Sequence, residues 1–481
     1  MLFNSFAFGC FMIIVFLIYW SIAGKTKLQN IFLLAASYFF YGWWDWRFLS
    51  LVLLCSLVNY VGGLLMMSCD DQRRRKLVLT VCCLASFGVL GLFKYYDFFI
   101  LSLSDALAYI GLPFHATSLR LILPVGISFY TFHTLSYTID VYRRRFEPTR
   151  DIVAFFLFVS IFPLAMAGPI ERASNLLPQI YRKRKFDYDL AVDGLRQILW
   201  GLFKKAVIAD RCASCVDTIF MDPGAQSGST LALGAILFAF QIYGDFSGYS
   251  DMALGVGKLL GFRFLSNFSV PYFSRDIAEF WRRWHISLNT WFRDYLYIPL
   301  GGSRGPRRQV VRNTFAIFLI SGLWHGANWT FVAWGAFHAL LFLPSILSGR
   351  NRRHTDTVAA GRRLPTVREL LQMSLTFLLV TLGWIFFRAE TIGQAWEYIL
   401  GIVSSPTLLS MPNLHDFKPI TALFILIFIL VEWLGRELPH PFAGPFPGVR
   451  RWPLRFITYY ALILIIVLYA GSTQQFIYFQ F

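Results

Sequence analysis

Long hydrophobic runs, each nearly free of charge, recur along the whole chain. An apolar run of roughly 17 to 25 residues can cross the hydrocarbon core of a bilayer as one helix. The pattern therefore predicts an all-α, polytopic integral membrane protein with about eleven transmembrane helices. The predicted spans are residues 2–24, 28–44, 48–69, 77–93, 121–139, 152–170, 223–244, 313–349, 370–387, 420–431 and 456–470, with one or two crossings left open for 223–261 and 313–349.

The composition excludes several classes of protein. Of the 481 residues, 56% are hydrophobic and 15% are charged, whereas a soluble domain carries about 25% charged residues. A chain this apolar could not cover its surface in water, and it fits neither a disordered nor a fibrous protein. Because the sequence shows no soluble domain and no tandem repeat, we expect residues 1–481 to form a single membrane-embedded domain.

The net charge of +17 is explained by basic residues in the loops beside the predicted spans, so it does not indicate that the protein binds a nucleic acid. Basic residues gather after the first, third and fifth predicted spans, at Lys25 and Lys27, at 73–76 and at 143–145. Loops rich in Lys and Arg stay on the cytoplasmic side, so the N-terminus is expected to face outward. No charge precedes the first span and no A-x-A site follows it, so we expect a retained span and no cleaved signal peptide.

The seven cysteines predict no disulfide framework, because their number is odd and most lie in apolar runs. Cys212 and Cys215 form a lone C-x-x-C pair, and a structural zinc needs about four ligands. We interpret both as packing residues and predict no metal site. The motifs H-E-x-x-H and Walker A are absent from the sequence.

Residues 241–251 carry polar groups into an apolar region of the chain. Asp245, Ser247 and Asp251 are spaced among Gly244 and Gly248. Irregular polar backbone at membrane depth is tolerated only against protein or a wet cavity, so this segment is predicted to line an internal space. An ordinary surface loop between two spans is the alternative.

Residues 280–294 alternate tryptophans with basic residues. Projected at 100° per residue, they form one amphipathic helix with Trp281 and Trp284 on the apolar arc. Arg282, Arg283 and Arg293 lie on the polar arc, and His285 lies at the edge of the apolar one. The pattern is typical of a helix at a membrane interface, and an anchoring helix with a packed histidine is the alternative.

His325 lies near the middle of the predicted span 313–349, and Asn328 and Trp329 follow one helical turn later. An ionisable group in such a run is a functional hypothesis by default. Burial favours the neutral imidazole, which is the form that a general base needs. His133 and His338 also lie in spans, and both are interpreted as core histidines.

Several long motifs follow one another along the chain, at residues 124–132, 166–170, 243–251, 282–285, 290–302, 322–329 and 384–390. In this order they resemble the membrane-bound O-acyltransferase superfamily, and among its members they are most similar to the bacterial alginate O-acetylation branch. The catalytic motif region covers about residues 120–390, and the two ends of the chain fit as well.

The resemblance implies a fold and a set of site residues. The helices would form a ring around a central tunnel, with interfacial or re-entrant helices beside the spans. His325 would be the active-site histidine of the superfamily, and His285 would occupy its second catalytic position. The residues expected to bind donor or substrate are Trp324, Asn328, Arg282, Arg283, Arg293, Asp245, Ser247 and Asp251.

The resemblance also implies a function. A multi-pass protein of the bacterial inner membrane would take acetyl from a cytoplasmic thioester, with acetyl-CoA as the expected donor and no permanently bound cofactor. A periplasmic SGNH-hydrolase-like acetyltransferase would complete transfer to a polysaccharide such as an alginate-like polymer, cellulose or peptidoglycan. Whether His325 acts as general base or as transient acyl carrier stays open. A transporter or a scaffold without its own chemistry is the alternative.

Overall fold

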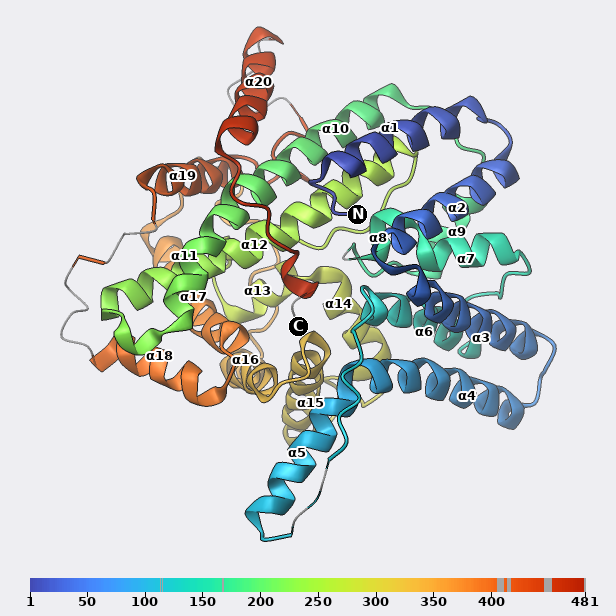
Figure 1. Cartoon of the computed structure of the whole chain (residues 1–481), viewed down its shortest axis with the longest axis horizontal. Coiled ribbons are helices and arrows are strands. Elements are labelled where there is room, and N and C mark those ends of the chain that lie inside the picture. The colour runs from blue at the N-terminus through green and yellow to red at the C-terminus, as the bar shows by residue number, and fades with distance from the viewer. Residues whose placement is uncertain are drawn as a thin grey trace. The chain divides into compact units, whose positions relative to one another are not determined.

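The computed structural model describes residues 1–481 except 113, 115, 167, 405–410, 413–416, 445–451 and 480–481. Every regular element among the described residues is helical, which confirms the predicted fold class (Figure 1). The chain forms two compact units, one of residues 1–188 with 259–265 and one of residues 189–258 with 266–481. The interpretation of 1–481 as one domain stays a prediction.

The first unit consists of helices whose starts follow local capping chemistry. The Asp71 and Asp151 side chains accept the amides of Arg73 and Ala154, which would otherwise have no partner. Its helices are α1 (Phe6–Ser21), α2 (Thr26–Asp45), α3 (Leu49–Met67), α4 (Gln72–Leu90), α5 (Tyr96–Tyr109), α6 (Ile127–Tyr142), α7 (Ile152–Ser160), α8 (Phe162–Ala165) and α9 (Ala173–Tyr181).

Two predicted spans of this unit are shorter than expected. The span 121–139 becomes helical only at Ile127, because Gly126 before it has a left-handed backbone with φ of 74°. The span 152–170 breaks at Ile161, which is non-helical and is followed by Pro163 in the short helix α8.

The second unit contains the predicted site residues. Its helices are α10 (Tyr188–Phe203), α11 (Asp210–Met221), α12 (Gly228–Leu259), α13 (Ile277–Arg283), α14 (Ile286–Phe292), α15 (Arg307–His325), α16 (Trp329–Leu347), α17 (Val367–Arg388), α18 (Ile392–Ser404), α19 (Pro419–Leu434) and α20 (Trp452–Tyr469). The π-helices η3 (Lys204–Ala209) and η6 (Arg293–Tyr297) continue α10 and α14, and the 3₁₀-turn η8 (Ile477–Phe479) follows α20.

Several helices are long and apolar enough to cross a membrane, as a multi-pass protein requires. Within the described residues these stretches are Thr26–Met67, Gln72–Tyr109, Gly228–Leu259, Trp329–Leu347 and Val367–Arg388, and Phe6–Ser21, Pro419–Leu434 and Arg455–Tyr469 are shorter apolar helices. The number of about eleven crossings stays a prediction.

The prediction of an irregular segment at 241–251 is wrong, because the whole stretch lies inside the continuous helix α12. Its glycines serve helix packing. A Cβ on Gly248 would lie 2.7 Å from the Gly201 carbonyl oxygen of α10, and a Cβ on Gly255 would lie 2.5 Å from that of Gly194. We call these four residues the glycine seam, along which α10 and α12 approach more closely than side chains would allow.

The core of the second unit is aromatic. Trp200, Trp284, Trp334 and Trp384 are among its fully buried side chains. Cys212 and Cys215 are buried in the hydrophobic core on α11, which agrees with their interpretation as packing residues.

Candidate active site

His285 lies at a break between two helices. The prediction of one amphipathic helix over 280–294 is wrong, because α13 ends at Arg283 and α14 begins at Ile286. His285 has a left-handed backbone, with φ of 45° and ψ of 53°, which costs roughly 1–3 kcal/mol in a residue other than glycine. Trp281 and Trp284 are buried in protein, so the segment is not a simple interfacial anchor.

Polar side chains hold this break in place. The side-chain amide of Asn289 donates to the backbone carbonyls of Trp281 and Trp284, at 2.7 and 2.6 Å. These carbonyls have no partner inside the short helix α13. Asn267 accepts the Ile286 amide on its carbonyl and the Ser287 hydroxyl on its side chain. The strained position of His285 is therefore fixed from both sides.

His325 is the last residue of α15 and does not lie in the middle of a span. The predicted run 313–349 is a pair of helices, α15 and α16, broken at residues 326–328. Asn328 forms the N-cap of α16 by accepting the Thr330 amide at 3.0 Å, and its own amide donates to the Glu390 carbonyl. The structure thus gives Asn328 a capping role, and His325 lies at the helix end that the break creates.

The two histidines lie close together. Their ring centroids are 6.2 Å apart, and the side chains are 1% and 3% exposed. Neither ring nitrogen of His285 has a hydrogen-bond partner among the described residues. We call the following set the histidine cluster: His285, His325 and the rings that contact them, Phe246, Trp324, Trp334, Phe387 and Tyr478.

Tyr478 completes the histidine cluster and was missed by the sequence analysis. Its ring centroid lies 5.5 Å from that of His325, 6.5 Å from that of His285 and 4.6 Å from that of Phe246. Figure 1 shows the red segment after α20 running inward toward α13 and α14. The segment is short and shows no periodic pattern, so the sequence offers no signal that it packs on the two histidines.

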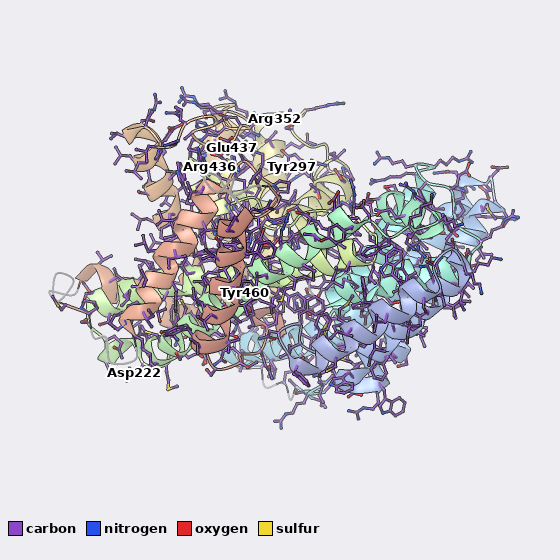
Figure 2. The ribbon with its side chains drawn as sticks, turned by 90° about the horizontal axis from the view of Figure 1, so that it is seen from above. Asp222, Tyr297, Arg352, Arg436, Glu437 and Tyr460 are labelled. Atoms are coloured by element: carbon purple, nitrogen blue, oxygen red, sulfur yellow. The ribbon has the colours of Figure 1, made fainter. Side chains whose placement is uncertain are left out.

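A cavity of about 490 Å³ lies near the histidine cluster, although no residue of that cluster lines it; its lining residue Trp281 contacts Trp334 of the cluster. Ile286, which follows His285, and Ser321, one helical turn before His325, are part of its wall. Arg282 and Arg293, which are expected to bind donor, line it together with Arg352, which the sequence analysis does not single out. Among the labelled residues of Figure 2, Tyr297 and Arg352 of this cavity lie on the side that carries Arg436 and Glu437, opposite Asp222.

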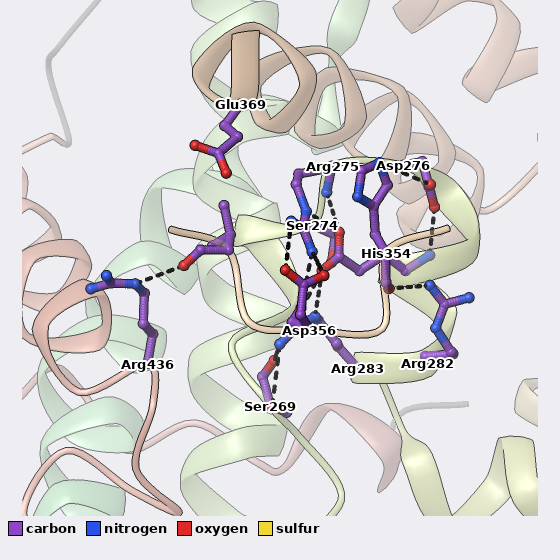
Figure 3. A network of polar contacts seen from close by, with 12 residues as sticks. Ser269, Ser274, Arg275, Asp276, Arg282, Arg283, His354, Asp356, Glu369 and Arg436 are labelled. Carbon is purple, nitrogen blue, oxygen red and sulfur yellow. Dashed lines mark hydrogen bonds and ion pairs between the residues drawn. The ribbon is translucent and has the colours of Figure 1, made fainter. Parts of the chain in front are cut away.

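Arg283 does not line this cavity but belongs to a buried network (Figure 3). Glu279 accepts from Arg275 and Arg283 at 3.0 and 2.9 Å, and Arg275 also pairs with Asp356 at 3.0 Å. Arg282 donates to the carbonyls of Asn351 and His354. We call Arg275, Arg282 and Arg283 the arginine clamp, because together they fix the loop 351–356 that forms part of the cavity wall.

The clamp also determines the charge of this loop. The hydrogen bond from Arg275 lowers the pKa of Asp356 below its usual value, so the carboxylate is ionised at neutral pH. Partial burial, and then the charge of Arg275, lower the pKa of His354. The imidazole is therefore neutral at pH 7, and its 3.9 Å approach to Asp276 is not an ion pair there.

The carboxylates of α12 lie against lysines of η3. Asp251 pairs with Lys204 at 2.5 Å, and Asp245 pairs with Lys205 at 2.7 Å. Asp251 and Lys204 line a second cavity, of about 220 Å³, whereas Asp245 is fully surrounded by protein. Ser247 is buried on the same helix. Lys204 and Lys205 stand out in the sequence as adjacent cations between apolar residues, and that signal could have found them.

Comparisons with known proteins assign the chain to a family. Residues 128–382 match the model of the membrane-bound O-acyltransferase family. A probable alginate O-acetylase AlgI of Pseudomonas aeruginosa is 42% identical over 447 residues, which are 90% of this chain and 81% of the relative. A peptidoglycan O-acetyltransferase of Helicobacter pylori is 34% identical over 79% of this chain and 75% of its own length. A teichoic acid D-alanyltransferase of Streptococcus thermophilus is 28% identical over 55% of this chain and 68% of its own length.

Proposed function

Because this chain belongs to the membrane-bound O-acyltransferase family, we propose that it passes acetyl groups from cytoplasmic acetyl-CoA across the membrane for O-acetylation of an extracytoplasmic polysaccharide. The observation that carries the proposal is the pair of buried imidazoles, 6.2 Å apart, together with a nearby arginine-lined cavity whose wall includes Ile286 and Ser321. Relatives named for acetylation of alginate and of peptidoglycan support the class of acceptor.

His325 is the proposed catalytic group, and two routes are open to it. As general base it takes the proton of the acceptor hydroxyl while that oxygen adds to the thioester carbonyl, and the leaving thiolate is then protonated. As acyl carrier its ring nitrogen adds to the carbonyl, the thiolate leaves, and the hydroxyl later displaces the imidazole. Both routes convert a thioester and a hydroxyl into an ester and a thiol.

The donor is proposed to enter through the 490 Å³ cavity. Its volume falls within the range of small-molecule sites, about 300–1,000 Å³. Arg293 and Arg352 supply cations for phosphates, while Asn289 and Thr290 supply polar groups to orient the chain of the donor. The thioester would then reach the wall formed by Ile286 and Ser321, next to the two histidines.

The orientation is proposed from the basic loops. The segment that carries Arg352 and Arg353 would be cytoplasmic, the N-terminus would be periplasmic, and the membrane would be the bacterial inner membrane. A periplasmic SGNH-hydrolase-like acetyltransferase is the proposed partner that completes transfer to the sugar. An Arg74→Cys variant tests the orientation, because modification by an impermeant thiol reagent in intact cells would place that loop outside and reverse the proposal.

Thioester turnover by the purified protein tests the enzymatic step. Protein in liposomes is mixed with radiolabelled acetyl-CoA and the partner fraction, and the free thiol of CoA and the esterified acetyl are measured separately. We expect both to appear with the wild type and neither with a His325→Ala protein at equal amount. Acetyl movement without release of the CoA thiol would instead identify a transporter, and full turnover by the His325→Ala protein would reject the proposed site.

A further inference from the structure

A buried ion cluster holds the segment that carries Tyr478. Lys205 lies 2.7 Å from carboxylate oxygens of both Asp210 and Asp245, and all three side chains are almost completely buried. None of the three contributes to the histidine cluster or to either cavity described above. Charged groups at such depth need a reason to be there, because removing them from water is costly.

The cluster bonds to the backbone of residues 474–477. Lys205 donates to the Gln474 carbonyl at 3.1 Å, and Asp245 accepts the Ile477 amide at 2.7 Å. Lys205 thus satisfies one backbone acceptor of this segment, and Asp245 satisfies one backbone donor. Both bonds matter because residues 474–476 form no helix that could pair these groups. Phe476 and Ile477 are buried beside these bonds, so the segment is fixed by charge and by packing.

A glycine allows the same segment to approach η3. The Gly471 amide donates to the Ala206 carbonyl at 2.8 Å. A Cβ on residue 471 would lie 2.7–2.8 Å from the backbone of Asp210 and Arg211, closer than real side chains come. The accepting carbonyl belongs to the π-helix η3, and such helices are frequently found at functional sites.

We infer that Lys205 and Asp245 are positioning residues for acyl transfer, which anchor residues 474–477 and thereby hold Tyr478 against both histidines. They touch neither donor nor acceptor and act through the anchored segment. Without the anchor, the ring 5.5 Å from His325 loses its fixed place and the histidine cluster opens on that side. The inference rests on the proposed function for its effect on rate, but the anchoring itself can be measured without any turnover.

Asp245→Asn is the test variant, and Asp251→Asn is its matched control. In Asp245→Asn, Lys205 keeps Asp210 as a partner, so no lysine is left buried without a carboxylate. Asp251→Asn makes the same change on the same helix in the adjacent ion pair with Lys204, which has no bond to residues 471–479. Gly471→Ala is a second test variant, since it displaces the segment while leaving every charge in place.

The position of the segment is read from an Ile477→Cys label. The alkylation rate at residue 477 is followed by peptide-resolved mass spectrometry, which separates it from the native cysteines. We expect Asp245→Asn and Gly471→Ala to raise that rate about 10-fold or more, because a buried group becomes accessible. Asp251→Asn should leave it unchanged. A protected residue 477 in folded Asp245→Asn and Gly471→Ala proteins would overturn the inference.

Kinetics then connect the anchor to the reaction. A misplacement of about 1 Å can lower a rate about 100-fold, so both test variants should lower kcat by about 10- to 100-fold while the KM for acetyl-CoA changes little. Their effects should not add in the double variant, whereas those of Asp251→Asn and Gly471→Ala should multiply. An exposed residue 477 with normal kcat would show that the anchor does not serve transfer. Absence of turnover in the wild type would reject the proposed function and leave the labelling result intact.

Discussion

The histidine cluster and the arginine clamp carry the same kind of sequence signal, polar side chains in an aromatic segment, but they are built in opposite ways. In the clamp, Arg282 and Arg283 donate to fixed carbonyls and carboxylates of the protein. In the histidine cluster, His285 has no hydrogen-bond partner among the described residues and is surrounded by aromatic rings. The arginines have fixed partners and shape the cavity wall, whereas both ring nitrogens of His285 are uncommitted. His338 shares this feature, so the proximity of His285 to His325, and not the missing partners alone, marks His285 as a site residue.

The largest effect should come from His325→Ala. Loss of a general base or acyl carrier should reduce acetyl transfer by about 100-fold or more. Protein yield should stay near that of the wild type, because the imidazole is a small part of an aromatic core. The measurement is acetyl transfer per amount of folded protein in liposomes.

A second buried histidine provides the control for that experiment. His133 is 1% exposed, and its ring accepts the Glu171 amide at 3.1 Å, which agrees with the interpretation as a core residue. His133→Ala should lower thermal stability while the rate per folded molecule stays near normal. An equal loss of rate in both variants would show that burial alone, and not chemistry, makes these histidines important.

A smaller effect is expected at His285, where the backbone limits the choice of variant. His285→Ala should lower kcat by about 10-fold if the residue orients donor or acceptor. Asn tolerates a positive φ better than most residues and can make a similar hydrogen bond, so His285→Asn should retain more activity. If Ala and Asn variants were equally inactive at equal stability, an imidazole would be required and the orienting role would be wrong.

Substitutions of Arg282 and Arg352 should affect the KM for acetyl-CoA for different reasons, because the two side chains have different partners. Arg282→Gln releases the carbonyls of Asn351 and His354 and should raise the KM for acetyl-CoA by about 5-fold through loss of the cavity wall. Arg352→Gln removes a cation that can meet a phosphate, and we expect a rise of about 3-fold.

Salt distinguishes the two causes. Exposed charge interactions are screened at about 0.1–0.5 M salt, so the KM of the wild type should rise with ionic strength. The Arg352→Gln protein should lose part of that dependence, whereas Arg282→Gln should keep it. Equal salt dependence in all three proteins would indicate that neither arginine meets the donor phosphates.

The smallest effect concerns Asp356. Its pKa is lowered in the folded protein, so its contribution to the loop is complete above the pKa of the unfolded chain and is lost only as pH falls through the lower folded value. The KM for acetyl-CoA should therefore not change through this group between about pH 5 and pH 8. Asp356→Asn should raise it by about 2-fold at every pH in that window, because exposed ion pairs contribute little. A pH-dependent difference between the two proteins would contradict the assignment.

The sequence predicts the helical class well because span length and hydropathy are properties of single segments. It fails where helices break. The periodicity of 100° per residue continues through His285 and does not reveal its left-handed backbone. That residue is fixed by Asn289 in the following helix and by Asn267 from a separate segment. The glycines of α12 indicate an irregular segment in isolation, and only the approach of Gly201 and Gly194 shows that they pack helices.

The sequence could predict the site residues that lie in continuous motifs, but not those that reach the site through contacts between distant segments. His285 and His325 lie in long motifs, and the structure brings them close together. The partners of Asp245 and Asp251 come from a helix that precedes them by about 40 residues, and Tyr478 comes from more than 150 residues after His325. Contacts of such separation leave no periodic trace in one sequence, so hydropathy could not assign them.

The glycine seam has a consequence for the biogenesis of the protein. Helix α12 carries Asp245 and Asp251, and inserting one such carboxylate at the centre of a lone helix costs about 2.5–3.5 kcal/mol on the translocon scale. The compensating lysines, Lys204 and Lys205, are synthesised first, at the end of α10. We therefore expect α10 and η3 to stay near the insertion machinery until α12 is synthesised. The segments should then enter the bilayer together, with the lysines already paired to the carboxylates. Larger residues in the seam would then reduce the yield of inserted protein before any effect on catalysis could be seen.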